Sequence, residues 1–139
     1  HGPAIEEENG RKEWYSNGKL HREHGPAIEE ENGRKEWYSN GKLHREDGPA
    51  IEAENGDKFW YMNGELHRED GPASMNYDDG FQRWYLNGIL HREDGPASVW
   101  SALPCWFDIE EGYKWWYLNG KELTEEEHAS QNSLVKRVI

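Results

Sequence analysis

A phrase of 23 residues, HGPAIEEENGRKEWYSNGKLHRE, occupies residues 1–23 and is repeated without a single change at residues 24–46. Looser copies follow, so that Gly-Pro-Ala, Trp-Tyr and Asn-Gly recur in the same order five times. A repeat of this length is one supersecondary unit, and such units bury their apolar faces only by stacking on one another. The sequence therefore predicts five repeats and a different C-terminal segment, at residues 1–23, 24–46, 47–69, 70–93, 94–123 and 124–139.

The 15 glycines fall into three classes of five: one in each Gly-Pro-Ala, one in each first turn and one in each Asn-Gly of the second turn. Because every glycine is explained as a turn residue, none remains for a phosphate-binding loop. The segment from Gly-Pro-Ala to the first-turn glycine measures 8, 8, 8, 9 and 17 residues in the five repeats, whereas the rest of the unit is constant. We therefore expect a β-bulge in the fourth repeat and an insertion, which contains Trp106 and Phe107, in the fifth.

The first turn of the first repeat, Asn9-Gly10, lies between two runs of about six residues, which is typical of a β-hairpin with a two-residue loop. Such a loop sets Ile5 opposite Trp14 and places the tryptophans on one face of the ribbon and the tyrosines on the other. The segment after the second turn is expected to cross back as a connector whose leucine caps the tryptophan face; these are Leu20, Leu43, Leu66, Leu90 and Leu123. The predicted fold is all-β, an elongated single-layer array of stacked antiparallel β-hairpins.

Composition narrows the class of protein. The chain is only 34% hydrophobic and carries a net charge of −12, which is typical of disorder, but 18 aromatic side chains supply the apolar surface that disordered chains lack. No apolar run is long enough to span a membrane, and the negative charge excludes a cationic nucleic-acid binder. Cys105 is the sole cysteine, so we expect a reducing, cytoplasmic compartment. The chain begins at His1 inside a repeat, which we interpret as a truncated N-terminus from which a signal could have been lost.

The pattern Trp-Tyr-x-Asn-Gly-x-Leu-His-Arg-Glu-Asp-Gly-Pro-Ala, as it stands at residues 60–73, resembles the MORN repeat. The likeness is to the bacterial and viral variant of this repeat, some members of which are labelled antitoxin components, and it extends from Gly2 to about Leu123. The resemblance implies a MORN-like solenoid of stacked β-hairpins with an interaction role, and it implies no catalytic residue.

The segment after the repeats begins with a capping box, in which Thr124 is the N-cap and Glu127 is the third helical residue. A helix of about twelve residues should follow and cover the last hairpin, because a repeat array needs a lid at its end. The N-terminal edge has no such lid, so self-association through this uncapped edge is a further expectation.

His-Arg-Glu recurs in each connector, at His21, His44, His67 and His91. Equivalent histidines of successive repeats would lie about 10 Å apart, whereas two nitrogens on one metal ion lie within about 4.2 Å of each other. We therefore interpret these histidines as connector residues that hydrogen-bond the turn backbone, and we expect no metal and no cofactor. The neighbouring arginines have two interpretations, local ion pairs or a basic ladder for phosphate, and the flanking acids favour local pairs.

The tyrosine column has two interpretations that the sequence leaves open, packing inside a curved sheet or an exposed stripe for a partner. The insertion of the fifth repeat is either a lid on the array, which we favour, or an interaction site. The candidate partner-binding residues are Tyr15, Tyr38, Tyr61, Tyr85, Tyr117, Arg45, Arg68, Arg92, Trp106 and Phe107.

No serine has a base at a fixed spacing, and the carboxylates are too numerous for any pair to stand out, so we expect no enzyme. The sequence favours a non-catalytic scaffold that binds another protein through an acidic and aromatic repeat surface. The alternative is an acidic inhibitor or antitoxin that blocks the basic, nucleic-acid-binding site of a partner enzyme. A third function is the binding of a small ligand or carbohydrate on the aromatic columns. We expect neither direct nucleic-acid binding nor membrane binding.

Overall fold

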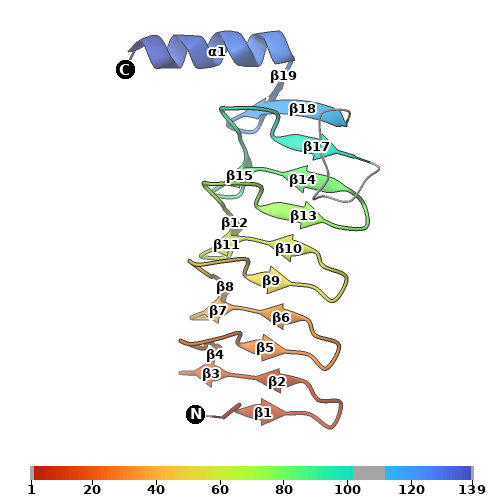
Figure 1. Cartoon of the computed structure of the whole chain (residues 1–139). Coiled ribbons are helices and arrows are strands. Elements are labelled where there is room, and N and C mark those ends of the chain that lie inside the picture. The colour runs from red at the N-terminus through yellow and green to blue at the C-terminus, as the bar shows by residue number, and fades with distance from the viewer. Residues whose placement is uncertain (1, 102–111, 139) are drawn as a thin grey trace.

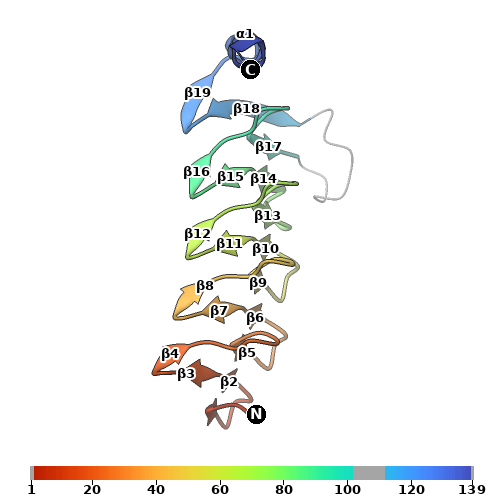
Figure 2. The same ribbon diagram turned by 90° about the vertical axis from the view of Figure 1, so that its left-hand side faces the viewer.

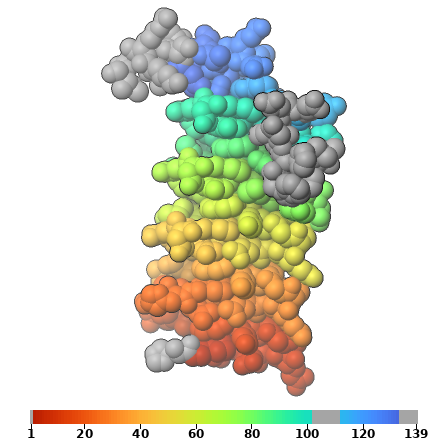
Figure 3. Space-filling view, in the orientation of Figure 1, coloured from red at the N-terminus to blue at the C-terminus, as the bar shows by residue number. Residues whose placement is uncertain are grey.

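The computed structural model describes residues 2–101 and 112–138. The strands of each repeat form one layer, which we call a rung, and the rungs stack from the N-terminus to a helix at the C-terminal end (Figure 1). The space-filling view shows the same elongated body, in which successive repeats follow one another along the long axis (Figure 3). The predicted all-β repeat fold with a C-terminal capping helix is confirmed.

One antiparallel sheet of eleven strands runs the length of the described chain, in the order β1-β2-β5-β6-β9-β10-β13-β14-β17-β18-β19. Its strands are β1 (Ile5–Glu6), β2 (Lys12–Glu13), β5 (Ile28–Glu29), β6 (Lys35–Glu36), β9 (Ile51–Glu52), β10 (Lys58–Phe59), β13 (Ser74–Asn76), β14 (Phe81–Arg83), β17 (Ser98–Trp100), β18 (Tyr113–Leu118) and β19 (Lys121–Leu123). Each repeat therefore pairs with the next, and stacking continues from rung to rung.

A second, short hairpin follows the main-sheet hairpin in each of the first four repeats. Figure 2 shows these second hairpins in one column that turns away from the main sheet. They are β3 (Tyr15–Ser16) with β4 (Lys19–Leu20), β7 (Tyr38–Ser39) with β8 (Lys42–Leu43), β11 (Tyr61–Met62) with β12 (Glu65–Leu66), and β15 (Tyr85–Leu86) with β16 (Ile89–Leu90). In the fifth repeat the long strand β18 runs through both parts of the rung and pairs with β17 and β19.

The first turn differs from the predicted one by one residue. Ile5 pairs with Glu13, and the backbone N–H of Gly10 donates to the carbonyl of Glu7 at 3.0 Å. The loop thus holds three residues and ends on Gly10 at a φ of 85°, as in a type I turn followed by a left-handed glycine. The prediction of a two-residue loop with Ile5 opposite Trp14 was wrong, because the extra loop residue shifts the pairing by one position.

The second turn is the true two-residue hairpin loop. Asn17 and Gly18 both have positive φ, 52° and 76°, which is the signature of a type I′ turn. The connector therefore pairs as a strand, and Leu20 lies opposite Tyr15. The predicted leucine cap over the tryptophans was wrong, because the group over the indole of Trp14 is the guanidinium of Arg22, 3.8 Å from the ring centroid. In the fifth repeat, where the leucine comes one position later, Leu123 lies opposite Trp116.

The core follows the alanines of Gly-Pro-Ala rather than a column of indoles. Ala27, Ala50, Ala73 and Ala97 have no exposed surface, and the side chain after each of them is also buried. The repeat tryptophans are half-buried. The expected interior of indole rings was therefore wrong.

The fourth repeat places its extra residue in the first turn. Asn76 pairs with Phe81 without interruption of the ladder, and the N–H of Gly80 donates to the carbonyl of Asn76, four residues back, at 2.9 Å. The predicted bulge was therefore wrong, since lengthening the loop leaves the sheet intact. The insertion of the fifth repeat lies at residues 102–111, outside the described residues.

Helix α1 (Glu125–Val138) covers the last rung (Figure 1). The N–H of Glu127 donates to Oγ1 of Thr124 at 3.1 Å, which confirms the predicted N-cap. His128 is buried, and its Nε2 lies 2.6 Å from the carbonyl oxygen of Arg92. The amide of Asn132 donates to the carbonyl of Glu93. Polar groups therefore hold the lid on the connector of the fourth repeat.

Candidate binding surface

The connector face is the side of the array formed by the His-Arg-Glu connectors, at residues 21–24, 44–47, 67–70 and 91–94. Four grooves follow one another along it, with cavity volumes of about 500, 690, 740 and 670 Å³ from the N-terminal end. We name them grooves I to IV. Groove I lies between residues 2–4 and the first connector, and each later groove lies between two successive connectors. The repeat thus produces one groove per rung.

An arginine stacks on the tryptophan in each of these rungs. The distances from guanidinium carbon to indole centroid are 3.8, 3.9, 3.9 and 4.0 Å for Arg22, Arg45, Arg68 and Arg92. Each guanidinium also donates through Nη1 to the carbonyl of the following Gly-Pro-Ala proline at 3.0–3.1 Å. Hydrogen bonds to a carbonyl and a cation–π contact hold the group in one place.

The same arginines form local ion pairs, as the sequence favoured. Nε of Arg45, Arg68 and Arg92 lies 3.1, 3.0 and 2.9 Å from the aspartate two residues later. The hydrogen bond from Arg92 lowers the pKa of Asp94 from its ordinary value. These three candidate residues therefore line the grooves without forming a free basic ladder.

The connector histidines bind the turn of the next repeat. Nδ1 of His21, His44, His67 and His91 accepts the backbone N–H of the second-turn asparagine at 2.9–3.1 Å. This confirms their interpretation as connector residues that hydrogen-bond the turn backbone. Within the described residues, no three His, Cys, Asp or Glu side chains are grouped so that they could hold a metal ion.

The groove rims carry exposed carboxylates. The side chains of Glu46, Asp47, Glu69, Asp70, Glu93 and Asp94 are 81, 87, 86, 87, 69 and 86% exposed. Each pair repeats with its rung, at a spacing of about 10 Å for two strands. Sequence reasoning predicted an acidic repeat surface and paired these acids with the arginines, but it did not place them on the rims of successive grooves.

The lining of the grooves includes the one variable position of the Trp-Tyr-x-Asn-Gly motif. Ser16 and Ser39 line grooves I and II, whereas Met62 and Leu86 line grooves III and IV. This part of the lining therefore changes from a hydroxyl to an apolar side chain toward the C-terminus. The sequence signal was available, since this position changes while its neighbours do not.

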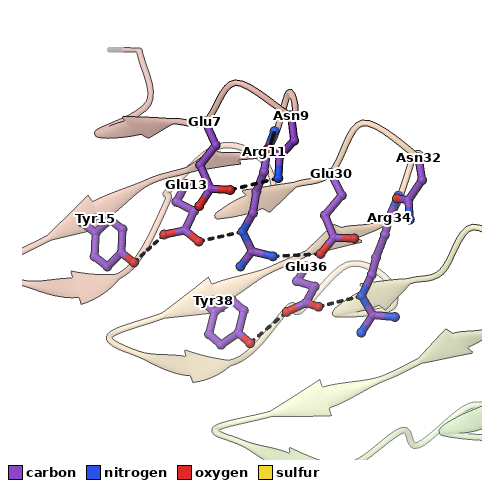
Figure 4. Close-up of polar contacts among 10 residues, drawn as sticks. All are labelled: Glu7, Asn9, Arg11, Glu13, Tyr15, Glu30, Asn32, Arg34, Glu36 and Tyr38. Carbon is purple, nitrogen blue, oxygen red and sulfur yellow. Dashed lines mark hydrogen bonds and ion pairs between the residues drawn. The ribbon is translucent and has the colours of Figure 1, made fainter.

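The tyrosine column is tied to the sheet by hydrogen bonds at its N-terminal end. The hydroxyls of Tyr15 and Tyr38 donate to the carboxylates of Glu13 and Glu36 at 2.6 and 2.9 Å. Each carboxylate also accepts a hydrogen bond from the Nε of an arginine (Figure 4). Nη1 of Arg11 continues to Glu30 of the next rung at 2.9 Å. The contacts thus link two repeats.

Burial separates the first tyrosine from the others. Tyr15 is 39% exposed, while Tyr38, Tyr61, Tyr85 and Tyr117 are half-buried. Burial, followed by the bond to Glu36, raises the pKa of Tyr38 to about 12. Burial also raises the pKa of Tyr61 and Tyr117. Tyr15 and Tyr38 line grooves I and II together with the serine that follows each, whereas Tyr61 and Tyr85 are not among the residues that line grooves III and IV.

The candidates Trp106 and Phe107 lie outside the described residues. Comparisons with protein-family models, with curated proteins and with solved structures found no match. Over residues 2–101 and 112–138, no helix is both long enough and apolar enough to cross a membrane.

Proposed function

We propose that this MORN-like chain is a non-catalytic scaffold that binds an extended, positively charged segment of another protein along its connector face. The observation that carries the proposal is the row of four grooves, one per rung, with exposed carboxylates on their rims. A surface that repeats along an array suits a partner that is itself extended and repetitive.

The groove spacing supports an extended partner. Two strands advance the array by about 10 Å. A polyproline II helix rises by about 9 Å per turn of three residues. A lysine or arginine at every third position would therefore place one cation between each pair of rims.

The charges that line the grooves favour a positively charged partner. The groove arginines already stack on indoles and bond to prolines and carboxylates, so they offer little to an anion. The outer carboxylates stay in water and can pair with a cation without a large desolvation cost. The net charge of −12 would steer a cationic partner toward the array.

The test is binding of two synthetic peptides of equal length and charge, measured by calorimetry. One peptide has lysine at every third position, and the other has the same lysines grouped at one end. We expect the spaced peptide to bind more tightly, with affinity that falls between about 50 and 500 mM salt. Equal binding of both peptides would contradict recognition by groove spacing.

A matched pair of chain variants locates the binding. Replacing the rim acids by Glu69→Gln and Asp70→Asn should weaken the spaced peptide about fivefold, since exposed ion pairs contribute up to about 1 kcal/mol each. The control replaces two exposed first-turn acids, Glu54→Gln and Asp79→Asn, and should leave binding unchanged. An equal effect of both variants would indicate that binding depends on net charge alone.

The second candidate, an inhibitor that blocks a basic nucleic-acid-binding site, is favoured by the same outward row of carboxylates. The two functions differ in what they predict for a partner that binds both this chain and nucleic acid. If the chain is an inhibitor, the chain and the nucleic acid should exclude each other from the partner in a competition titration, whereas a scaffold would permit a ternary complex.

A further inference from the structure

The tips of the second hairpins carry a pair of side chains that changes from repeat to repeat, and these hairpins lie in one column (Figure 2). The pair joins the residue before Asn-Gly to the residue after it, so the two side chains lie on the same face of the ribbon. The five pairs are Ser16 with Lys19, Ser39 with Lys42, Met62 with Glu65, Leu86 with Ile89, and Leu118 with Lys121. Of these five, the fourth is apolar on both strands.

The apolar tip of the fourth repeat adjoins groove IV. Leu86 is half-buried and lines this groove together with Trp84. Its cross-strand partner Ile89 is 49% exposed, although its Cγ2 packs so close to Gly120 that a Cβ there would come within 3.1 Å of it. The position of Ile89 holds an exposed lysine in three of the other repeats. Groove IV therefore combines acidic rims with an apolar surface that a partner can cover.

Within the described residues, the row of grooves ends at groove IV, because helix α1 follows. The helix contacts the last connector, where Nε2 of His128 lies 2.6 Å from the carbonyl oxygen of Arg92. The amide of Asn132 donates to the carbonyl of Glu93. Arg92 and Glu93 both line groove IV. The apolar tip therefore marks one end of the row.

A mark at one end matters because the grooves are otherwise similar. If a partner places a cation at every groove, a shift by one groove, about 10 Å, brings the same kinds of group together again. A contact that is present at one groove removes this equivalence, since the shifted partner loses it. The pair of Leu86 and Ile89 can supply such a contact.

The charges at the tips favour the same part of the row. Lys19 and Lys42 place exposed cations at the first two tips, and Lys121 places one at the fifth. The third tip has the carboxylate of Glu65 instead, and the fourth is uncharged. A cationic partner is repelled least at the third and fourth tips.

We infer that the cationic partner segment carries an apolar side chain next to the cation at groove IV, and that this side chain packs on Leu86 and Ile89. The contact fixes the direction and the register of the partner along the connector face. The inference rests on the proposed function, because it concerns the partner of the same grooves.

The test uses three synthetic peptides of about ten residues, with lysine at every third position, which is long enough to span grooves II to IV. One peptide is polar between its lysines, and the other two carry a single leucine beside the first or the last lysine. The two leucine peptides have equal length, composition and charge, so each controls the other. We expect one of them to bind about fivefold more tightly than the polar peptide in calorimetry, since its leucine covers apolar surface, and the other to show no gain.

The failure of this inference differs from the failure of the proposed function. If neither leucine peptide gains over the polar peptide, or if both gain equally, the inference is overturned. The proposed function still stands in that case, provided that spaced lysines bind more tightly than grouped lysines. Equal binding of spaced and grouped lysines would overturn the proposed function, and the inference with it.

A chain variant tests the place of the contact. Leu86→Ser restores the residue of the first two repeats, and Ile89→Gln removes the apolar side chain without adding a charge. In the double variant, the ratio of the affinities for the better leucine peptide and the polar peptide should fall from about five to about one. Tyr113→Gln removes a 67% exposed ring from β18, outside the grooves, and should keep the ratio. An unchanged ratio in the double variant would overturn the placement.

NMR of the chain with labelled isoleucine methyl groups gives an independent readout. The better leucine peptide should shift the methyl signal of Ile89. Ile51 is 8% exposed in the main sheet, and its signal should stay in place. An unshifted Ile89 signal at saturating peptide would overturn the inference.

Discussion

The first and second repeats have the same 23 residues and different environments. Ile28 is 4% exposed and its counterpart Ile5 is 45% exposed; Tyr38 is half-buried and Tyr15 is 39% exposed. Because the two sequences are identical, the difference comes from their neighbours: within the described residues, the second repeat lies between two others and the first has one on one side. Burial in this array is therefore a property of the contact between rungs, as expected for a quasi-one-dimensional protein.

The comparison has an energetic consequence. Fully burying an isoleucine contributes about 1.5–3 kcal/mol relative to leaving it exposed, and the first repeat gains only part of that. The main-sheet hairpin of the first repeat, within the described residues, also has a neighbouring strand on only one side. We therefore expect the first rung to open locally more often than the second.

The largest effect should come from truncating the buried isoleucine. Ile28→Ala should lower the free energy of unfolding by about 2–4 kcal/mol, because it removes buried apolar surface and leaves a cavity. Ile5→Ala should cost less than about 1 kcal/mol. Urea denaturation of the two variants measures both values. Equal losses would show that the two identical repeats are equally packed in solution.

The next effect concerns the arginine over the indole. Arg68→Met keeps much of the stem and removes the cation–π contact, the bond to the carbonyl of Pro72 and the pair with Asp70. We expect a loss of about 2 kcal/mol in the free energy of unfolding. Arg22→Met should cost somewhat less, since position 24 holds a histidine in place of the aspartate and the ion pair that Arg22 does form, with Glu29, is longer at 3.2 Å. A larger loss for Arg22→Met in urea denaturation would contradict this order.

The repeat periodicity, the strand-rich rungs and the capped C-terminal helix could be predicted, because they depend on exact repetition and on local residues such as Thr124 and Glu127. The strand register at the first turn could not be predicted. Asn-Gly occurs in both turns, yet only Gly10 has a positive φ in the first, whereas both Asn17 and Gly18 do in the second. The dipeptide alone permits both loop lengths, and pairing with the neighbouring rung decides between them.

The candidate surface was predictable in part. The histidine role followed from a spacing argument, and the structure confirms it. The stacking of Arg22 on Trp14 did not follow, because the second hairpin must first fold back and bring a residue eight positions later over the ring. An acidic surface was predicted, but its arrangement as the rims of grooves did not follow, since Asp47 both pairs with Arg45 at 3.1 Å and stays 87% exposed.

The histidine contact between rungs should contribute about 1 kcal/mol. His67→Ala removes the acceptor of the Asn87 N–H, which lies 2.9 Å from Nδ1, and leaves that donor to water. His24→Ala is the control, because this histidine is exposed and does not occupy the connector position of His67. Thermal denaturation should separate the two variants. A matching loss for His24→Ala would indicate a general effect of losing a histidine.

The tyrosine difference gives a pH dependence. The pKa of Tyr38 is raised to about 12 from 10, so its protonated form is favoured in the folded chain, and the associated stability is present below pH 10 and lost as the pH rises toward 12. The half-buried site and solvent screening reduce this to about 1 kcal/mol or less. Tyr38→Phe should therefore lose less stability than the parent between pH 9 and 12. Tyr113→Phe, at a 67% exposed position, is the control and should follow the parent.

The smallest effect is a gain. His24 occupies the position of Asp47, Asp70 and Asp94, so His24→Asp should place a carboxylate beside Nε of Arg22, as in the later connectors. We expect the free energy of unfolding to rise by about 0.5 kcal/mol at low salt, since the pair is exposed. The gain should disappear near 1 M salt, where charges are screened within about 3 Å. His24→Asn lacks the charge and should show no gain, so a gain shared by both variants would assign it to the loss of histidine rather than to the new ion pair.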